Sequence, residues 1–148
     1  MTQLYRGTLA SSDLPRVLVV DDHPEARESL ARYLRIKGFR VSEATDGRSA
    51  LEAVRTEPSF SVVLVDLSLP DVDGREVGRE VRRLSPDTRC MLVTGWSLEP
   101  EEYESWGIDR LFTKPVDLAE LCRVLAEATP NRSGDDSVPA SPSNVIRS

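Results

Sequence analysis

Ser61-Val-Val-Leu-Val-Asp66-Leu-Ser-Leu-Pro70-Asp-Val-Asp-Gly74 is an apolar run of strand length that ends on one carboxylate and then turns at once into proline and glycine. Continuous Val and Leu on both faces is typical of a central parallel strand, because helices cover such a strand above and below. Ligands of open parallel sheets bind beyond the carboxyl ends of the strands. Asp66 is therefore a candidate site residue.

Four other apolar runs share the chain with this one, and helical patterns separate them. We expect strands at 16–20, 39–44, 61–66, 90–94 and 108–113. We expect three longer helices, which begin at Pro24 and end before Gly38, begin at 47 and end before Pro58, and cover about 75–84. A fourth helix should have about two turns within 98–106, and a fifth should carry the apolar residues Leu118, Leu121, Cys122 and Leu125 on one face. This alternation predicts an α/β fold, a flavodoxin-like doubly wound sheet of five parallel strands in the order 2-1-3-4-5 with about five helices.

The composition fits one globular domain with tails. We expect a domain at 16–128, a loose N-terminal arm at 1–15 and a disordered tail at 129–148 among the 148 residues. A formal charge of −6 disfavours binding to nucleic acid, since that affinity comes from Lys and Arg. Without an apolar run of membrane-span length or a signal peptide, we expect a cytoplasmic protein. Cys90 and Cys122 lack metal-ligand spacing, and we expect buried thiols without a disulfide.

Polar residues follow or end four of the five expected strands. Asp21 and Asp22 follow the first, Asp66 ends the third, Thr94 ends the fourth and Lys114 follows the fifth. Parallel strands put these ends at one edge, where three carboxylates would repel one another unless a cation lay between them. Mg²⁺ suits a site with few carboxylates, and a carboxylate beside it can attack phosphorus. We therefore expect Asp66 to be a nucleophile, with Lys114 and Thr94 contacting phosphoryl oxygens.

At these residues the chain resembles the receiver domains of two-component response regulators. The matching motifs are Asp21-Asp22 after a Val-rich strand, Asp66 in Val-Asp-Leu-x-Leu-Pro-x-x-x-Gly ending at Gly74, Thr94-Gly95, and Lys114-Pro115. The resemblance covers residues 16–128, which leads us to expect a single receiver domain without an output domain.

The resemblance implies a role for each site residue. Asp66 would accept a phosphoryl group from a phosphohistidine, and Thr94 and Lys114 would sense it. Mg²⁺ would be ligated by Asp22, Asp66 and the backbone carbonyl of Ser68, with Asp21 acting through water. The Lys114-Pro115 peptide bond would be cis, and Gly74 would be a structural turn.

The resemblance also implies partners and limits. The phosphoryl donor would be a histidine kinase or a histidine phosphotransfer protein, and the signal would pass to an unknown downstream protein. We expect no nucleic acid or membrane partner, and a monomer or a phosphorylation-dependent dimer. The chain would catalyse only its own phosphorylation and dephosphorylation.

Two positions depart from the usual pattern. Leu111 stands three residues before the lysine, where the family often has Tyr or Phe that rotates inward on activation. Trp96 stands two positions after Thr94, where a small or polar residue is common, so we hypothesise that Trp96 slows water attack on phospho-Asp66. The short fourth helix suggests an atypical output surface.

Other functions fit fewer of these features. A Mg²⁺-dependent phosphatase with an aspartyl nucleophile would resemble Asp-x-Asp, but Asp66-Leu-Ser68 lacks the second carboxyl group. A degenerate receiver with a structural role is disfavoured because all five site residues are present. Taken alone, Asp21-Asp22 could cap a helix and the 71–74 segment could be a simple turn. His23 is expected to be a surface residue.

Overall fold

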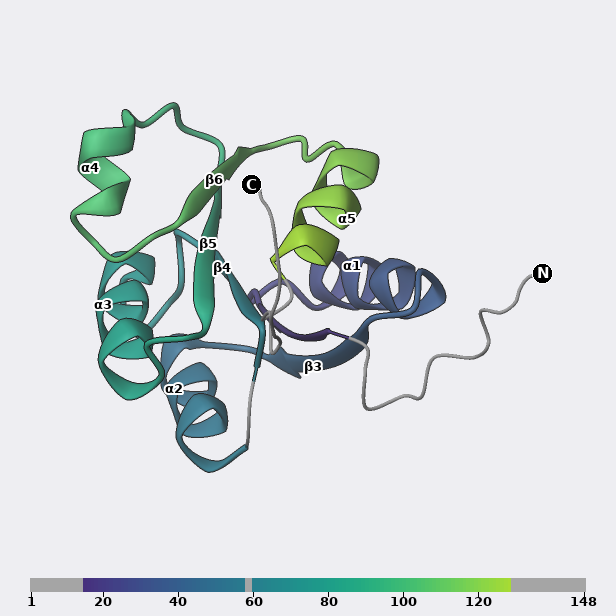
Figure 1. The fold of residues 1–148 in the computed structure, drawn as a ribbon, viewed down its shortest axis with the longest axis horizontal. Helices are drawn as coiled ribbons and strands as arrows, with labels where there is room; N and C mark the ends of the chain where they lie inside the picture. Colours follow the sequence, from purple (N-terminus) through teal and green to yellow (C-terminus); the bar gives the residue numbers. More distant parts are fainter. Residues whose placement is uncertain (1–14, 58–59, 129–148) are drawn as a thin grey trace, which may run out of the picture.

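Strands and helices alternate throughout the chain in the computed structural model, which describes residues 15–57 and 60–128 (Figure 1). The elements are β2 (Arg16–Val20), α1 (Pro24–Ile36), β3 (Arg40–Ala44), α2 (Gly47–Thr56), β4 (Val62–Asp66), α3 (Gly74–Leu84), β5 (Arg89–Thr94), α4 (Pro100–Glu104), β6 (Arg110–Thr113) and α5 (Leu118–Glu127). The predicted arm at 1–14 and tail at 129–148 lie outside the described residues.

The sheet has five parallel strands in the order β3-β2-β4-β5-β6. In chain order this is 2-1-3-4-5, so the predicted fold class and topology are confirmed. All ten predicted elements are present. Strand β4 lies at the centre, between β2 and β5, and all five of its residues are buried. This double burial explains why its sequence is continuously apolar instead of alternating.

Helices cover both faces of the sheet, with α1 and α5 on one face and α2, α3 and α4 on the other (Figure 1). Alternate side chains of each strand therefore enter different cores. In β2, Val17 and Val19 pack with Leu34 of α1 and Leu121 of α5. Leu18 and Val20 point the opposite way, into the core that contains Ala50 of α2 and Val77 and Val81 of α3.

The helix predicted within 98–106 is shorter than two turns. It covers only Pro100–Glu104, and Gly107 follows with a positive φ of 79°. The amide of Ile108 bonds back to the carbonyl of Tyr103, which closes the helix end. The amide of Ile108 is thus used by the helix end, although its side chain is buried in the core, and β6 begins at Arg110 and not at 108 as predicted.

Other strand boundaries differ from the prediction by one residue. Strand β3 begins at Arg40 instead of 39, because the amide of Phe39 bonds to Leu34 at the end of α1. Strand β4 begins at Val62 instead of 61, and β5 begins earlier, at Arg89. Within the described ranges, no helix has the length and apolar character needed for a membrane span.

Candidate functional site

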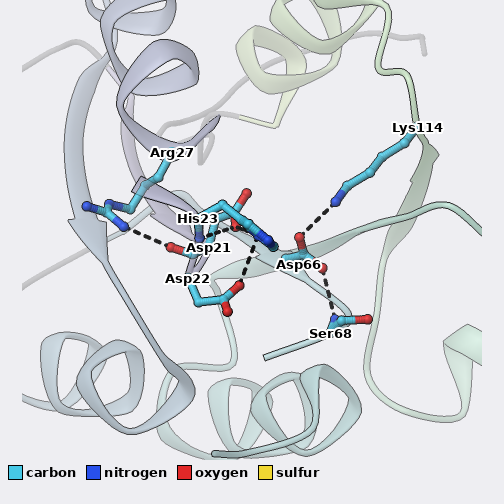
Figure 2. A network of polar contacts seen from close by, with 7 residues as sticks. All are labelled: Asp21, Asp22, His23, Arg27, Asp66, Ser68 and Lys114. Atoms are coloured by element: carbon cyan, nitrogen blue, oxygen red, sulfur yellow. Dashed lines mark hydrogen bonds and ion pairs between the residues drawn. The ribbon is translucent and has the colours of Figure 1, made fainter. Parts of the chain in front are cut away.

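The carboxylate of Asp66 lies at the carboxyl end of the central strand, with both oxygens hydrogen bonded (Figure 2). Its Oδ2 accepts from the ammonium of Lys114 at 2.9 Å, and its Oδ1 accepts from the backbone amide of Ser68 at 2.9 Å. The residue is only 6% exposed. Asp66 is therefore a buried acid, fixed in orientation by one cation and one amide.

Lys114 brings positive charge to this acid from the end of β6. The hydrogen bond to Asp66 raises the pKa of the Lys114 ammonium above its ordinary value. Partial burial lowers this pKa, but the negative charges of Asp66, Asp21 and Asp22 raise it further. Lys114 is therefore a stable cation at neutral pH. The Lys114-Pro115 peptide bond is cis, the isomer that the resemblance implies.

Asp21 and Asp22 follow β2, the strand beside β4, and bring two more carboxylates to this edge. Three residues, Asp21, His23 and Asp66, each offer one possible ligand atom, and these three atoms lie within 4.8 Å of one another. Asp21 Oδ1 accepts from the amide of His23 at 2.9 Å, and His23 Nδ1 lies 3.4 Å from the same oxygen. The Asp pair does not start α1 as a cap, because the N-cap of that helix is His23.

The two carboxylates take different positions from those that the resemblance implies. Asp21, expected to act through water, belongs to the group with Asp66, whereas Asp22, expected to be a direct ligand, does not. His23 Nδ1 lies 3.2 Å from Asp22 Oδ1, so the imidazole sits between the two acids. The His23 side chain is 73% exposed, as predicted for a surface residue, but its contact with both acids was not predicted.

The acidic group fits a hard divalent cation. Within the described part of the chain, Asp22 Oδ1 is a buried oxygen that makes no hydrogen bond, although His23 Nδ1 lies 3.2 Å from it. A buried, unpartnered carboxylate oxygen is costly unless a cation binds to it. Carboxylate oxygens are the ligands that Mg²⁺ prefers, and Asp21, Asp22 and Asp66 supply them at one edge. These residues therefore fit a Mg²⁺ ion.

Arg27 supports the acidic loop from the first part of α1 (Figure 2). Its Nη1 donates to the backbone carbonyl of Asp21 at 3.1 Å, and its Nε donates to Glu43 of β3 at 3.1 Å. The guanidinium thus fixes the backbone of the loop that carries the Asp pair. Arg27 was not predicted to be part of the site, because a lone Arg on a helix gives no pattern that marks its partner.

Thr94 ends β5 and is buried at the same edge. Its Oγ1 accepts from the amide of Trp96 at 3.1 Å, which leaves the hydroxyl hydrogen for another acceptor. The carbonyl of Thr94 also accepts from the amide of Lys114 at 2.8 Å, so the two residues are tied together. The five predicted residues Asp21, Asp22, Asp66, Thr94 and Lys114 all lie at the carboxyl ends of neighbouring strands.

Gly74 allows the loop after Asp66 to close tightly. A Cβ at Gly74 would lie 3.0 Å from the carbonyl oxygen of Asp66 and 3.0 Å from Cα of Leu67. The amide of Gly74 bonds to the carbonyl of Leu67, and the Asp73 carboxylate caps α3 by accepting from the amide of Arg75. Residues 71–73 therefore form a bend that leads into α3, and Gly74, predicted to belong to a turn, is the first residue of that helix.

The two atypical positions lie in different surroundings. The Trp96 side chain is 69% exposed and lines a groove of about 560 Å³ together with Ser68 and Trp106. The indole is thus beside the loop that carries Ser68. Leu111 is partly buried against the core on the α2, α3 and α4 face.

Comparison with known proteins gives a family model and several relatives of this chain. The family model of the response regulator receiver domain matches residues 17–126. The transcriptional activator protein PfeR of Pseudomonas aeruginosa is 38% identical over 109 residues, which are 72% of this chain and 35% of PfeR. The response regulator receiver protein CpdR of Brucella abortus is 31% identical over 73% of this chain and 91% of CpdR. The chain thus spans about a third of one curated relative and most of another.

Among solved structures, the response regulator protein TrrA of Thermotoga maritima in complex with Mg²⁺ and BeF superposes with a TM-score of 0.70. It is 30% identical, and the match covers 78% of this chain and 99% of TrrA.

Proposed function

The chain belongs to the family of response regulator receiver domains of two-component systems, and from that premise we propose that Asp66 accepts a phosphoryl group from a phosphohistidine. The observation that carries the proposal is the geometry of Asp66, a buried carboxylate held by Lys114 Nζ and the amide of Ser68. An oxygen of Asp66 forms a bond to phosphorus as the P–N bond of the phosphohistidine breaks. The electron pair of that bond returns to the imidazole nitrogen.

Receiver domains bind Mg²⁺ at an acidic site, and we propose that this chain does so through Asp22, Asp66 and the backbone carbonyl of Ser68. Asp21 would act through water. The buried oxygen of Asp22 without a hydrogen-bond partner supports the role of Asp22 as a ligand. The grouping of Asp21 with Asp66 supports an acidic site at this edge, but it puts Asp21 closer to Asp66 than a role through water alone requires. When bound, Mg²⁺ neutralises oxygen charge on the phosphoryl group.

The remaining site residues would act on the same phosphoryl oxygens. Lys114 offers a cation from the side opposite the Asp pair, and its raised pKa keeps it charged. Thr94 has its hydroxyl hydrogen available, because its oxygen is the acceptor toward Trp96. Such preorganised donors stabilise charge on a transferring phosphoryl group.

The family is not one of classical enzymes, and we propose that this chain catalyses only its own phosphorylation and dephosphorylation. An aspartyl phosphatase needs a second carboxyl group as acid and base, whereas Ser68 stands two residues after Asp66. A purely structural role would not explain why five polar residues lie together at one edge of the sheet.

Receiver domains interact with histidine kinases or histidine phosphotransfer proteins, and one of these is the proposed phosphoryl donor here. The signal would leave through contacts with a downstream protein, with the chain as a monomer or as a dimer formed on phosphorylation. A cytoplasmic location stays a prediction from the sequence.

Tryptophan emission during addition of beryllofluoride and Mg²⁺ tests the proposal, since Trp96 lines the groove beside Ser68. We expect a saturable change in the unaltered chain, none in Asp66→Asn, and a reduced change in Trp96→Phe. No response, or the same response in Asp66→Asn, would contradict the proposal. Steady phosphate release from a small phosphate ester would favour the phosphatase.

A further inference from the structure

Asp71, in the loop between β4 and α3, binds a helix that is distant in the sequence. Its Oδ1 accepts from the amides of Gly47 at 2.9 Å and Val72 at 2.8 Å, and its Oδ2 accepts from the amide of Arg48 at 3.0 Å. Gly47 and Arg48 are the first two residues of α2. One carboxylate therefore joins the β4–α3 loop to the start of α2.

Helix α2 has a cap of its own, so Asp71 is not needed to start it. Asp46 accepts from the amide of Ser49 at 2.8 Å, and the Ser49 hydroxyl accepts from the amide of Asp46 at 3.3 Å. The two carboxylates thus divide the unpaired amides of the first turn between them. What Asp71 adds is the connection to the loop.

The loop and the helix also meet in close contact. A Cβ at Gly47 would lie 2.7 Å from Cβ of Val72 and 3.2 Å from Cγ2 of Val77. Only glycine therefore lets Val72 approach α2 this closely. The hydrogen bonds of Asp71 and the missing side chain of Gly47 act on the same contact.

The same loop carries the backbone of Ser68 to Asp66. Ser68 donates its amide to Asp66 Oδ1, and the bond from the Gly74 amide to the Leu67 carbonyl closes the base of the loop. Asp71 lies three residues after Ser68, with Pro70 between them. Asp71, in the later part of the loop, is thus bonded to α2, while Ser68, in its earlier part, lies at the acidic site.

We propose that Asp71 is a positioning residue for the acidic site, which holds the β4–α3 loop against α2 so that the backbone of Ser68 stays at Asp66. This inference rests on the proposed function, because it assumes that the Ser68 carbonyl ligates Mg²⁺. Loss of the connection would free the loop and weaken Mg²⁺ binding without removing a ligand.

Mg²⁺ titration by calorimetry, together with the thermal unfolding midpoint, tests this proposal. Asp46→Ala is the matched control, since it removes the other cap of α2, a carboxylate that accepts its hydrogen bond from Ser49 within the helix. We expect Asp71→Ala and Asp46→Ala to lower the midpoint similarly. Only Asp71→Ala is expected to weaken Mg²⁺ binding, by roughly tenfold, as outer partners of metal sites do. Asp71→Asn, which keeps one acceptor oxygen, should lie between Asp71→Ala and the unaltered chain.

A second variant reaches the same contact without changing the carboxylate. Gly47→Ala places a methyl group against Val72, so it should also weaken Mg²⁺ binding. Equal Mg²⁺ affinity in the unaltered chain, Asp71→Ala and Gly47→Ala would overturn the inference and leave the proposed function standing. Failure of the unaltered chain to bind Mg²⁺ would overturn both.

Discussion

The ammonium nitrogen of Lys114 lies 2.9 Å from Oδ2 of Asp66, across 48 positions of sequence. The lysine is 46% exposed, whereas the carboxylate is almost fully enclosed, so the cation spans from solvent to the buried acid. A phosphoryl group on Asp66 would therefore enter a space that already has a cation at its edge.

Replacing Lys114 should slow phosphorylation of Asp66. Lys114→Ala removes the cation that stabilises phosphoryl oxygens, and a loss of roughly 100-fold in rate is expected, the low end of the effect of removing one preorganised donor. The rate is measured with acetyl phosphate and Mg²⁺. Lys114→Arg keeps the charge and is the control, expected to be less affected. Equal rates in the unaltered chain and Lys114→Ala would show that Lys114 does not assist the phosphorylation of Asp66.

Trp96 is expected to slow the loss of the phosphoryl group. Its indole lines the groove that also borders Ser68, so Trp96→Ala should open a path for water and speed dephosphorylation several-fold. The decay of phosphorylated protein after removal of the phosphodonor measures this rate. Trp96→Phe keeps an aromatic ring and should decay more slowly than Trp96→Ala. An unchanged rate in Trp96→Ala rules the hypothesis out.

The contribution of Asp71 to stability should depend on pH. Burial raises the pKa of this carboxyl group, but the amides of Gly47, Arg48 and Val72 outweigh it, and the net pKa lies below the ordinary value of 3.8. A group with a lowered folded-state pKa stabilises the fold above its unfolded pKa and loses this effect as pH falls through the folded value. Asp71→Asn should therefore unfold at lower denaturant concentration than the unaltered chain at pH 7.

As the pH falls below 3.8 toward the lower folded-state pKa of Asp71, the difference between the two chains should shrink, because a protonated Asp71 accepts hydrogen bonds much as Asn does. Denaturant midpoints from pH 7 to pH 3 measure the difference. A difference that stays constant over this range would show that the charge of Asp71 does not stabilise the fold.

The two cysteines should differ in reactivity. Burial raises the pKa of the Cys90 thiol to about 12, and the negative charge of Asp109 makes a smaller contribution in the same direction. Only the thiolate form of a cysteine is reactive. In the described chain both thiols are free, and Cys122 is only partly buried. At pH 8 a disulfide reagent should modify Cys122 in the native protein, and Cys90 only after unfolding. Rapid labelling of native Cys122→Ser would contradict this placement of Cys90.

Much of the fold follows from the sequence because parallel strands with two buried faces leave a strong pattern. Val62–Asp66 is apolar on both faces and ends on a polar residue, and both features follow from its central place in the sheet. Boundaries were less predictable. The start of β6 depends on the bond from Ile108 to Tyr103, which no local pattern indicates.

The site was predictable where residues stand at strand ends, and not where they reach across loops. Asp66 and Lys114 could be placed together because parallel strands share one edge. Arg27 and Asp71 hold backbone groups of distant segments, and their partners depend on how loops fold. His23 was predicted to be exposed, but its position between Asp21 and Asp22 depends on the conformation of the loop after β2.

The most direct test of the account is mass spectrometry of the intact chain after incubation with acetyl phosphate and Mg²⁺, followed by borohydride reduction to mark the modified residue. We predict the addition of one phosphoryl group that requires Mg²⁺, maps to Asp66 and is absent in Asp66→Asn. A chain that stays unmodified, or a phosphoryl group that persists in Asp66→Asn, would contradict the assignment of Asp66 as the phosphoacceptor.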